Sequence, residues 1–469
     1  MKKLFIIALS LGVALPILAQ WKEFYYISAL LACALIFFSI KKWQVSLIDL
    51  LVLFLITIPL HTLRFGTQEH FIRLSEIAFI PLFLWWLAQL SLKQPGKPIT
   101  MRKEFIFLIL YLLINIVSLK NSIYPGISIE RIAILAYLFL FVYMVINILD
   151  SKDKIATIIK TSILISGFSA IIAAFQSIFP NLIIFTAVPM GRLLGITFYR
   201  AGVGWHDPNY YALYLGMNAS LTLTFILSPI TNLLDKRLLK ICFFLQIIGI
   251  LSTFSRTVFL SLTFVTFYLF YYFGRRRLAL SLLSITLITI IIISVSSLVI
   301  YKKNPFFASV LYRVADKDKL KEEPTLVMGH RYAAFKANTA MFLDHPILGV
   351  GPFMAMYNFS EYRPQGYKYP LPWLASHNQY LQLLSEKGIF GFLIFLGFIF
   401  VILKSMYSFI KKAADPFGKT CLIGLKSSIF VYLIVSLGLE TSYELQFWLT
   451  MGLAMAVFNM LSKEEKYAL

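Results

Sequence analysis

The sequence contains little charge. Only 14% of its 469 residues are Asp, Glu, Lys or Arg, whereas 59% are hydrophobic. A soluble domain needs far more polar surface, so this composition excludes a soluble globular protein and indicates a membrane protein. The apolar residues also form blocks long enough to cross a bilayer, which takes roughly 20 residues each.

Cysteine is equally scarce. Cys33, Cys242 and Cys421 are scattered through apolar runs, which excludes a disulfide framework or a cysteine-based metal site. The histidines also lack the i, i+4 spacing of a helical metal pair, so we predict no bound metal and no cofactor. Acidic residues are outnumbered by basic ones, and the formal charge is +21. In a membrane protein this charge indicates orientation and contact with anionic lipids rather than binding to nucleic acid.

The long apolar segments predict an all-α integral membrane protein with about 12–14 transmembrane helices. The approximate cores of the candidate spans are 4–19, 24–40, 45–60, 74–92, 105–119, 132–149, 155–178, 208–229, 240–253, 257–273, 279–300, 380–403, 420–438 and 445–461. Basic residues concentrate in alternate connections, such as Lys41-Lys42 and Arg275 to Arg277, which places both termini in the cytoplasm. Residues 1–19 also resemble a signal peptide, and we favour an uncleaved anchor over a cleaved one.

One outward loop is exceptional. Residues 302–378 form a long polar insertion between two spans, and loops of this length are usually functional or disordered. Tyr332, Phe335, Met341 and Phe342 recur at helical spacing, which predicts a short amphipathic helix in this extracytoplasmic loop. The chain therefore divides into three parts. These are N-terminal helices (1–180), a central region with the loop (181–410) and C-terminal helices (411–469).

Outward-facing arginines contradict the usual distribution of positive charge. Arg192, Arg200, Arg256 and Arg331 are of this kind. Arg256 lies between two apolar spans with almost no loop, where an arginine is costly unless it meets an anion. The guanidinium fork suits phosphate, although a side chain that reaches lipid headgroups is the alternative.

Two helix starts carry further polar residues. Arg200 opens a run with two glycines that ends in Asp207-Pro208-Asn209, where backbone N–H groups at a helix start favour an anion. His377 ends the long loop in Ser376-His377-Asn378, where an imidazole can accept a proton from a hydroxyl or cap the next helix. Glu386 follows nine residues later and is a candidate to orient a neighbour or pair with a cation.

Three stretches together resemble the O-antigen ligase and polymerase superfamily of bacterial envelope glycosyltransferases. The run from Arg200 to Asn209 resembles the family's arginine followed nine residues later by Pro-Asn, and Ser255-Arg256-Thr257 resembles its Ser-Arg-Thr/Gly turn. The third stretch comprises Gly329 to Arg331, Asp344 to Pro352, His377 to Leu381 and Glu386 to Gly391. The resemblance covers roughly residues 190–400, whereas the first 180 residues share only hydropathy.

The resemblance implies a bacterial inner-membrane enzyme with its active site on the periplasmic face and a glycan on undecaprenyl diphosphate as donor. Arg200 and Arg256 would bind the diphosphate and stabilise the charge of the leaving group. His377 would be the general base in a direct displacement with inversion. Because the diphosphate leaves readily, the reaction would need no metal. The further substrate-binding candidates are Arg192, Asn209, Arg331, Asn378 and Glu386.

The acceptor stays open within the superfamily. A ligase transfers the glycan to a lipid A core sugar, a polymerase extends another lipid-linked repeat unit, and related members modify protein hydroxyls. The single long loop ending in His-Asn favours a ligase. A flippase or transporter for the same lipid-linked glycan is the alternative from another class, but it needs charge along a passage through the membrane, whereas these arginines lie at one face.

Overall fold

The computed structural model describes residues 45–60, 64–66, 71–92, 102–179, 188–193, 196–205, 207–229, 233–281, 283–284, 329–365, 367 and 373–467. The predicted spans 4–19 and 24–40, the signal-like start and most of 279–300 lie outside these residues. So does the first part of the long loop.

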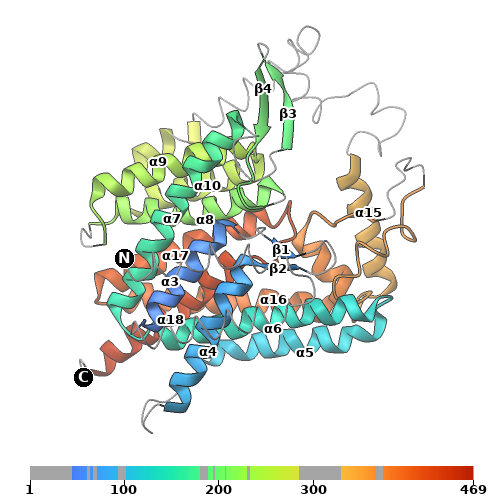
Figure 1. Cartoon of the computed structure of the whole chain (residues 1–469), viewed down its shortest axis with the longest axis horizontal. Coiled ribbons are helices and arrows are strands. Elements are labelled where there is room, and N and C mark those ends of the chain that lie inside the picture. The colour runs from blue at the N-terminus through green and yellow to red at the C-terminus, as the bar shows by residue number, and fades with distance from the viewer. Residues whose placement is uncertain are drawn as a thin grey trace.

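Helices make up most of the described chain (Figure 1). The long ones are α3 (Leu47–Thr57), α4 (Leu74–Leu92), α5 (Ile106–Ser118), α6 (Pro125–Ile148), α7 (Lys152–Ile178), α8 (Pro208–Leu227), α9 (Lys236–Thr253), α10 (Arg256–Tyr272), α15 (Gly329–Asp344), α16 (Gln379–Lys412), α17 (Pro416–Val435) and α18 (Leu445–Tyr467). Short 3-10 turns adjoin α3 and α5, namely η2 (Ile58–Leu60), η3 (Lys103–Phe105) and η4 (Leu119–Asn121).

Seven of the described helices are long and apolar enough to cross a membrane. They contain α5, α6, α7, α8, α16, α17 and α18. Large apolar side chains on the outer faces of these helices stay exposed, as Phe168 of α7 and Phe400 of α16 do. Such surfaces are stable in lipid and not in water, so the predicted all-α integral membrane fold is confirmed.

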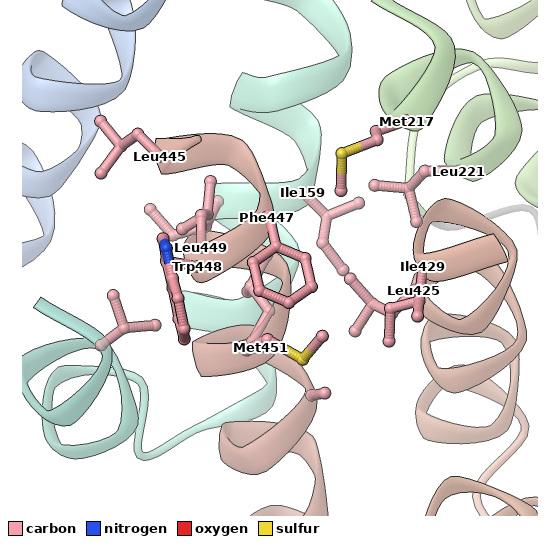
Figure 2. Packing of buried hydrophobic residues seen from close by; sticks show 14 of the residues in the cluster. Ile159, Met217, Leu221, Leu425, Ile429, Leu445, Phe447, Trp448, Leu449 and Met451 are labelled. Atoms are coloured by element: carbon pink, nitrogen blue, oxygen red, sulfur yellow. The ribbon is translucent and has the colours of Figure 1, made fainter. Parts of the chain in front are cut away.

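The core lies around α8, α17 and α18. In the most apolar stretches of α8 and α18, 89% of the residues are buried, against 28% in the stretch that contains α5. Figure 2 shows Phe447 and Met451 of α18 on the side that faces Ile159, Met217, Leu221, Leu425 and Ile429, whereas Trp448 lies on the other side of the helix. The rings of Tyr432 and Phe447 stack with their centroids 3.8 Å apart, which ties α17 to α18.

The helices begin at their capping residues rather than at the first residue of each apolar run. Helix α4 has the predicted bounds, but α6 begins at Pro125 rather than near 132. Pro125 occupies the first turn, where its missing N–H costs nothing, and the helix then includes Glu130 and Arg131. Likewise α9 begins at Lys236 because Asp235 caps it, accepting a hydrogen bond from the N–H of Arg237 at 2.6 Å.

The amphipathic helix predicted in the long loop exists as α15, and its large apolar residues do not all lie on the buried face. Ala333, Ala337 and Met341 are fully buried, whereas Phe335 is 51% exposed. The small residues face inward because α15 packs closely on α16 and on the loop that follows, forming a second small core. Figure 1 shows α15 at one end of α5 and α6.

Two short antiparallel hairpins, which the sequence did not predict, occur in the described chain. β1 (Arg64–Gly66) pairs with β2 (Phe71–Arg73), and β3 (Val188–Leu193) pairs with β4 (Ile196–Arg200). The second hairpin projects away from the helices in Figure 1 and places Arg200 where β4 returns to α7 and α9.

The segments of the third resembling stretch bind one another across a kink in α16. Gly388 interrupts α16 with φ 63° and ψ −167°. There the N–H groups of Val350 and Gly351 donate to the carbonyls of Ser385 and Glu386 at 2.8 and 3.0 Å. The N–H of Ile389 donates to the carbonyl of Pro346 at 2.8 Å. Residues 346–351 and 385–389, which we call the glycine junction, therefore share backbone hydrogen bonds.

Two glycines make this approach possible. A Cβ on Gly349 would lie 2.2 Å from the carbonyl carbon of Glu386, and a Cβ on Gly388 would lie 2.2 Å from the oxygen of Ile347. Both residues also have a positive φ, which L side chains adopt at a cost. The end of α5 and the start of α6 hold the junction from the other side. Asn121 donates to the carbonyl of Gly349 at 2.7 Å, and Ser128 donates to that of Pro352 at 2.7 Å.

Gly349→Ala should destabilise the protein by about 2 kcal/mol or more, because the methyl group adds both strain at positive φ and overlap with α16. Thermal unfolding in detergent measures the effect. Gly126→Ala is the matched control, since nothing lies within 4 Å of a Cβ there. It should leave the unfolding temperature unchanged or raise it slightly. Equal melting of the two variants would contradict the structural role of the junction.

Candidate functional site

His377 lies directly before α16, and its neighbour supplies the helix cap. The Oδ1 atom of Asn378 accepts hydrogen bonds from the N–H groups of Tyr380 and Leu381, both at 3.0 Å. Asn378 also donates to the carbonyl of Leu437 at 3.2 Å. The capping role therefore falls to Asn378, which leaves the imidazole of His377 without that task.

The backbone of His377 is held in a left-handed conformation, with φ 52°. Its N–H donates to Oε1 of Glu440 at 3.2 Å. Two residues on, the N–H of Gln379 donates to the carbonyl of Ser436 at 2.9 Å. A histidine in this region of φ is strained and persists only where its surroundings hold it. Here the loop between α17 and α18 provides that hold.

The half-buried imidazole of His377 is kept neutral. Burial lowers its pKa most, and the positive charge of Arg331 lowers it further. The carboxylate of Asp207 acts in the opposite direction. With a pKa below its usual value of about 6.5, the ring is unprotonated at pH 7 and can accept a proton.

Arg331 on α15 approaches the same loop as His377. Its guanidinium lies 3.6 Å from where a Cβ on Gly438 would be, and Oγ1 of Thr257 lies 3.4 Å from that point. Gly438 thus leaves room for Arg331 beside the turn that begins α10. The structure brings the Ser-Arg-Thr stretch, the long loop and the α17–α18 loop together.

Arg256 is the first residue of α10 and is exposed. Phe254, with φ 52°, ends α9 immediately before it, which makes the turn tight. Arg256 has no hydrogen-bond or ion-pair partner among the residues that the structure describes. A cation at a helix N-terminus is opposed by the helix dipole, so an anion would be favourable there.

Arg200 is bound into the protein at two points. Its Nε donates to the carbonyl of Thr253 at 2.9 Å, and its Nη2 donates to Oδ1 of Asn209 at 3.0 Å. Asn209 in turn donates from its Nδ2 to Asp207 at 2.8 Å. This chain joins β4, the end of α9 and the start of α8, and it ends at the carboxylate whose charge acts on His377.

Arg192 lies in β3, where it pairs with Thr197. Its side chain is outside what the structure describes, so its relation to His377 is not tested.

Glu386 lies in a buried polar network under the start of α16. Lys387 donates to its Oε2 at 2.8 Å. Glu386 therefore pairs with a cation, which is one of the two roles predicted for it. Gln382 donates from Nε2 to Oε1 of Glu386 at 3.1 Å and reaches Oε2 of Glu440 at 3.5 Å. Through Gln382, the two carboxyl groups are linked to the loop that holds His377.

A narrow crevice, too small to hold a water molecule, lies beside this network. It is lined by Phe353, Ala355, Met356, Gln382, Glu386 and Glu440. Phe353 lies at the rim with φ 63°, and the guanidinium of Arg131 stacks 4.0 Å from its ring centroid. The residues that line it therefore include apolar side chains as well as two carboxyl groups and an amide.

Burial raises the pKa of the Glu440 carboxyl to about 7, and the nearby charge of Glu386 adds to this effect. The N–H groups of His377 and Ser376 oppose the shift. Sequence reasoning missed Glu440, Gln382 and Lys387. The available signal for Glu440 was a carboxyl group in a short turn between two apolar spans.

No group of three or more His, Cys, Asp or Glu residues suited to a metal ion occurs in the described part of the chain. The predicted independence of metal stays a prediction.

Predicted site residues from four stretches thus gather at one end of the helices. The ends of α5, α9 and α17 meet the starts of α6, α8, α10, α16 and α18 there. Arg102, bound to Glu104 at the start of α5 and to Asn459 in α18, marks the other end. The molecule is an integral membrane protein with a polar site at one end of its apolar helices.

Comparison with known families defines the class further. Residues 241–396 match the family model described as O-antigen ligase, which confirms the resemblance to the O-antigen ligase and polymerase superfamily. This part of the chain, about a third of its length, is therefore similar to that enzyme family. The matched region includes Arg256, Arg331, His377, Asn378 and Glu386, whereas Arg200, Asn209 and Glu440 lie outside it. No curated protein matches the chain significantly.

Relative to wild type, Glu440→Gln should become more stable as the pH rises. Because the folded-state pKa of Glu440 is raised to about 7, its stabilising contribution is full below its unfolded value of about 4.3 and is lost as pH rises through 7. Glutamine carries no such dependence. The difference in unfolding temperature between variant and wild type should therefore move in favour of the variant between pH 5 and pH 8. Exposed Glu361→Gln is the control and should show a flat difference. A flat difference for Glu440→Gln as well would contradict the raised pKa.

Proposed function

We propose that this protein is a glycosyltransferase that moves a glycan from undecaprenyl diphosphate to an acceptor hydroxyl on the periplasmic face. Lipid A core is the acceptor that we favour, which makes the protein an O-antigen ligase. The observation that carries the proposal is the gathering of a neutral His377 with arginines from separate stretches at one helix end. An arginine-lined end suits an anionic donor, and a neutral imidazole suits a hydroxyl acceptor.

In the proposed reaction, the acceptor hydroxyl gives its proton to His377 while its oxygen attacks the anomeric carbon of the donor sugar. The bond from that carbon to the diphosphate breaks on the opposite side, which inverts the configuration. Arg256 stabilises the negative charge on the departing diphosphate. Arg200 holds the start of α8 and the end of α9 in place and also faces this charge. Arginines supply the positive charge that a divalent metal gives elsewhere, so the proposed reaction needs none.

The other candidates support this arrangement. Arg331 approaches the α17–α18 loop near His377 and is proposed to contact the donor. Asn378 and Asn209 position His377 and Arg200 through their hydrogen bonds. Arg192 remains a proposed substrate contact. On the distribution of basic residues, we also propose that both termini are cytoplasmic and that the site faces the periplasm of a bacterial inner membrane.

His377→Ala should abolish transfer while the donor still binds, because the substitution removes the base and leaves the arginines. A deletion strain of the native host is complemented with wild type or His377→Ala, and lipopolysaccharide is separated on a gel. If the deletion strain leaves long glycans on the carrier lipid and none on lipid A core, the protein is a ligase. Cores that carry a single repeat support a polymerase. Repeat units that accumulate on the cytoplasmic side of the deletion strain, together with full complementation of that strain by His377→Ala, would replace the transferase proposal by a flippase.

Arg256→Lys should reduce transfer by about 10²-fold, because a point charge lacks the planar fork that binds two phosphate oxygens. The measurement is the initial rate with purified protein and lipid-linked donor. Arg276→Lys is the matched control, since Arg276 is exposed just beyond the opposite end of α10 and should tolerate the change. Near-normal transfer by Arg256→Lys would remove Arg256 from the diphosphate site.

A further inference from the structure

We propose that Glu440 is a positioning residue, whose carboxyl group holds the backbone of His377 in its left-handed conformation and thereby directs the imidazole toward the acceptor hydroxyl. In this role Glu440 contacts neither substrate. The role rests on the proposed function, in which His377 is the base, and it adds the residue that fixes the direction of that base. Glu440 lies in the loop between α17 and α18, 63 residues from His377 in the chain.

The N–H of His377 needs an acceptor that α16 does not supply. His377 precedes the helix, so its N–H takes no part in the hydrogen bonds of the helical backbone. Oε1 of Glu440 accepts it at 3.2 Å. The N–H of the preceding Ser376 also binds this carboxyl group. Two successive N–H groups therefore depend on one side chain from another loop, and an N–H group left without an acceptor is unfavourable.

The residues that follow His377 are held independently of Glu440. Asn378 caps α16 through its own side chain. The N–H of Gln379 donates to the carbonyl of Ser436 at 2.9 Å, and the Gln379 side chain binds the same loop through both its oxygen and its nitrogen. The start of α16 is thus fixed to the α17–α18 loop without Glu440. What Glu440 adds is local to the histidine.

A left-handed histidine needs such a hold. With φ 52°, His377 has a conformation that residues with a Cβ adopt at a cost, whereas negative values of φ are open to them without strain. A return to negative φ would rotate the Cβ and the imidazole into another direction. Misplacement of a catalytic group by about 1 Å can cost about 10²-fold in rate. The hold on the N–H therefore determines where the ring points.

A chain of polar side chains keeps the carboxyl group of Glu440 in place. Nε2 of Gln382 donates to Oε2 of Glu440 at 3.5 Å and to Oε1 of Glu386 at 3.1 Å. Lys387 is only 1% exposed and is bound to Glu386 at 2.8 Å, so its charge is engaged there. One oxygen of Glu440 thus binds the start of α16, and the other binds His377 before it. The carboxyl group joins the base to the helix through side chains alone.

Steady-state kinetics of the full-length protein in detergent test this role, with undecaprenyl-diphosphate-linked glycan as donor and lipopolysaccharide that ends at the core as acceptor. Glu440→Ala should lower kcat about 10²-fold and leave both KM values within about two-fold, because neither substrate contacts Glu440. Glu440→Gln should restore kcat to within about three-fold of wild type, since the amide keeps one oxygen for the N–H of His377. Exposed Glu361→Ala is the control and should match wild type.

A second measurement reports the hold on His377 without any transfer. Diethyl pyrocarbonate acylates neutral imidazoles that are accessible, and mass spectrometry of the peptides gives the rate at each histidine. In Glu440→Ala, His377 should react several-fold faster relative to exposed His345, because the released ring is no longer kept in its half-buried position. In Glu440→Gln the ratio of the two rates should equal that of wild type.

Glu440→Asp replaces Glu440→Ala in both measurements if the latter does not fold. It keeps the charge, but its side chain is one methylene group shorter, which draws the carboxyl group away from the N–H of His377. The same selective loss of kcat and the same faster acylation of His377 are expected.

The outcomes separate the positioning role from the proposed function. An unchanged kcat, a rise in either KM with kcat unchanged, or an equal loss of kcat in Glu440→Gln and Glu440→Ala overturns the positioning role. An acylation ratio that stays at the wild-type value overturns it as well. If wild type transfers nothing to this core, the ligase function fails instead, and the acylation ratio still decides whether Glu440 holds His377.

Discussion

The site depends on the close backbone contact at the glycine junction. Residues 346–351 and 385–389 approach to a distance that no side chain permits, and the hydrogen bonds between them hold α16 at its kink. That kink sets the direction of the first part of α16, which carries Asn378, Gln382 and Glu386. Residues of the resembling Gly-Val-Gly and Glu-Lys-Gly stretches therefore form the frame of the site, and the polar chemistry is supplied by residues around them.

Opposite charges are kept apart at the polar end of the helices. Arginines from β4, α10 and α15 lie around the loops near His377, whereas Glu386, Glu440 and Gln382 gather beneath the start of α16. Glu386 is neutralised by its own neighbour, Lys387, so the network needs no arginine from the site.

Much of the fold followed from hydropathy, because lipid requires each backbone to satisfy its own hydrogen bonds in a helix. The bounds of α4 and the existence of α15 were predicted for this reason. The start of α6 was not, since Glu130 and Arg131 interrupt the apolar pattern while Pro125 still begins the helix. Which residues of α15 are buried was not predicted, because close packing on α16 places Ala333, Ala337 and Met341 inward and leaves Phe335 exposed.

The sequence by itself determined the class of protein, the apolar spans and which arginines and histidine stand at their ends. These are local properties, fixed by composition and spacing along the chain. Only the tertiary structure decided that Asn378 rather than His377 caps α16, and that Glu440 joins Glu386 through Gln382. It also decided that Arg331 meets the loop after α17. Those contacts connect residues far apart in the chain. Their geometry is set by the packing of the helices, which cannot be deduced from any single segment of the sequence.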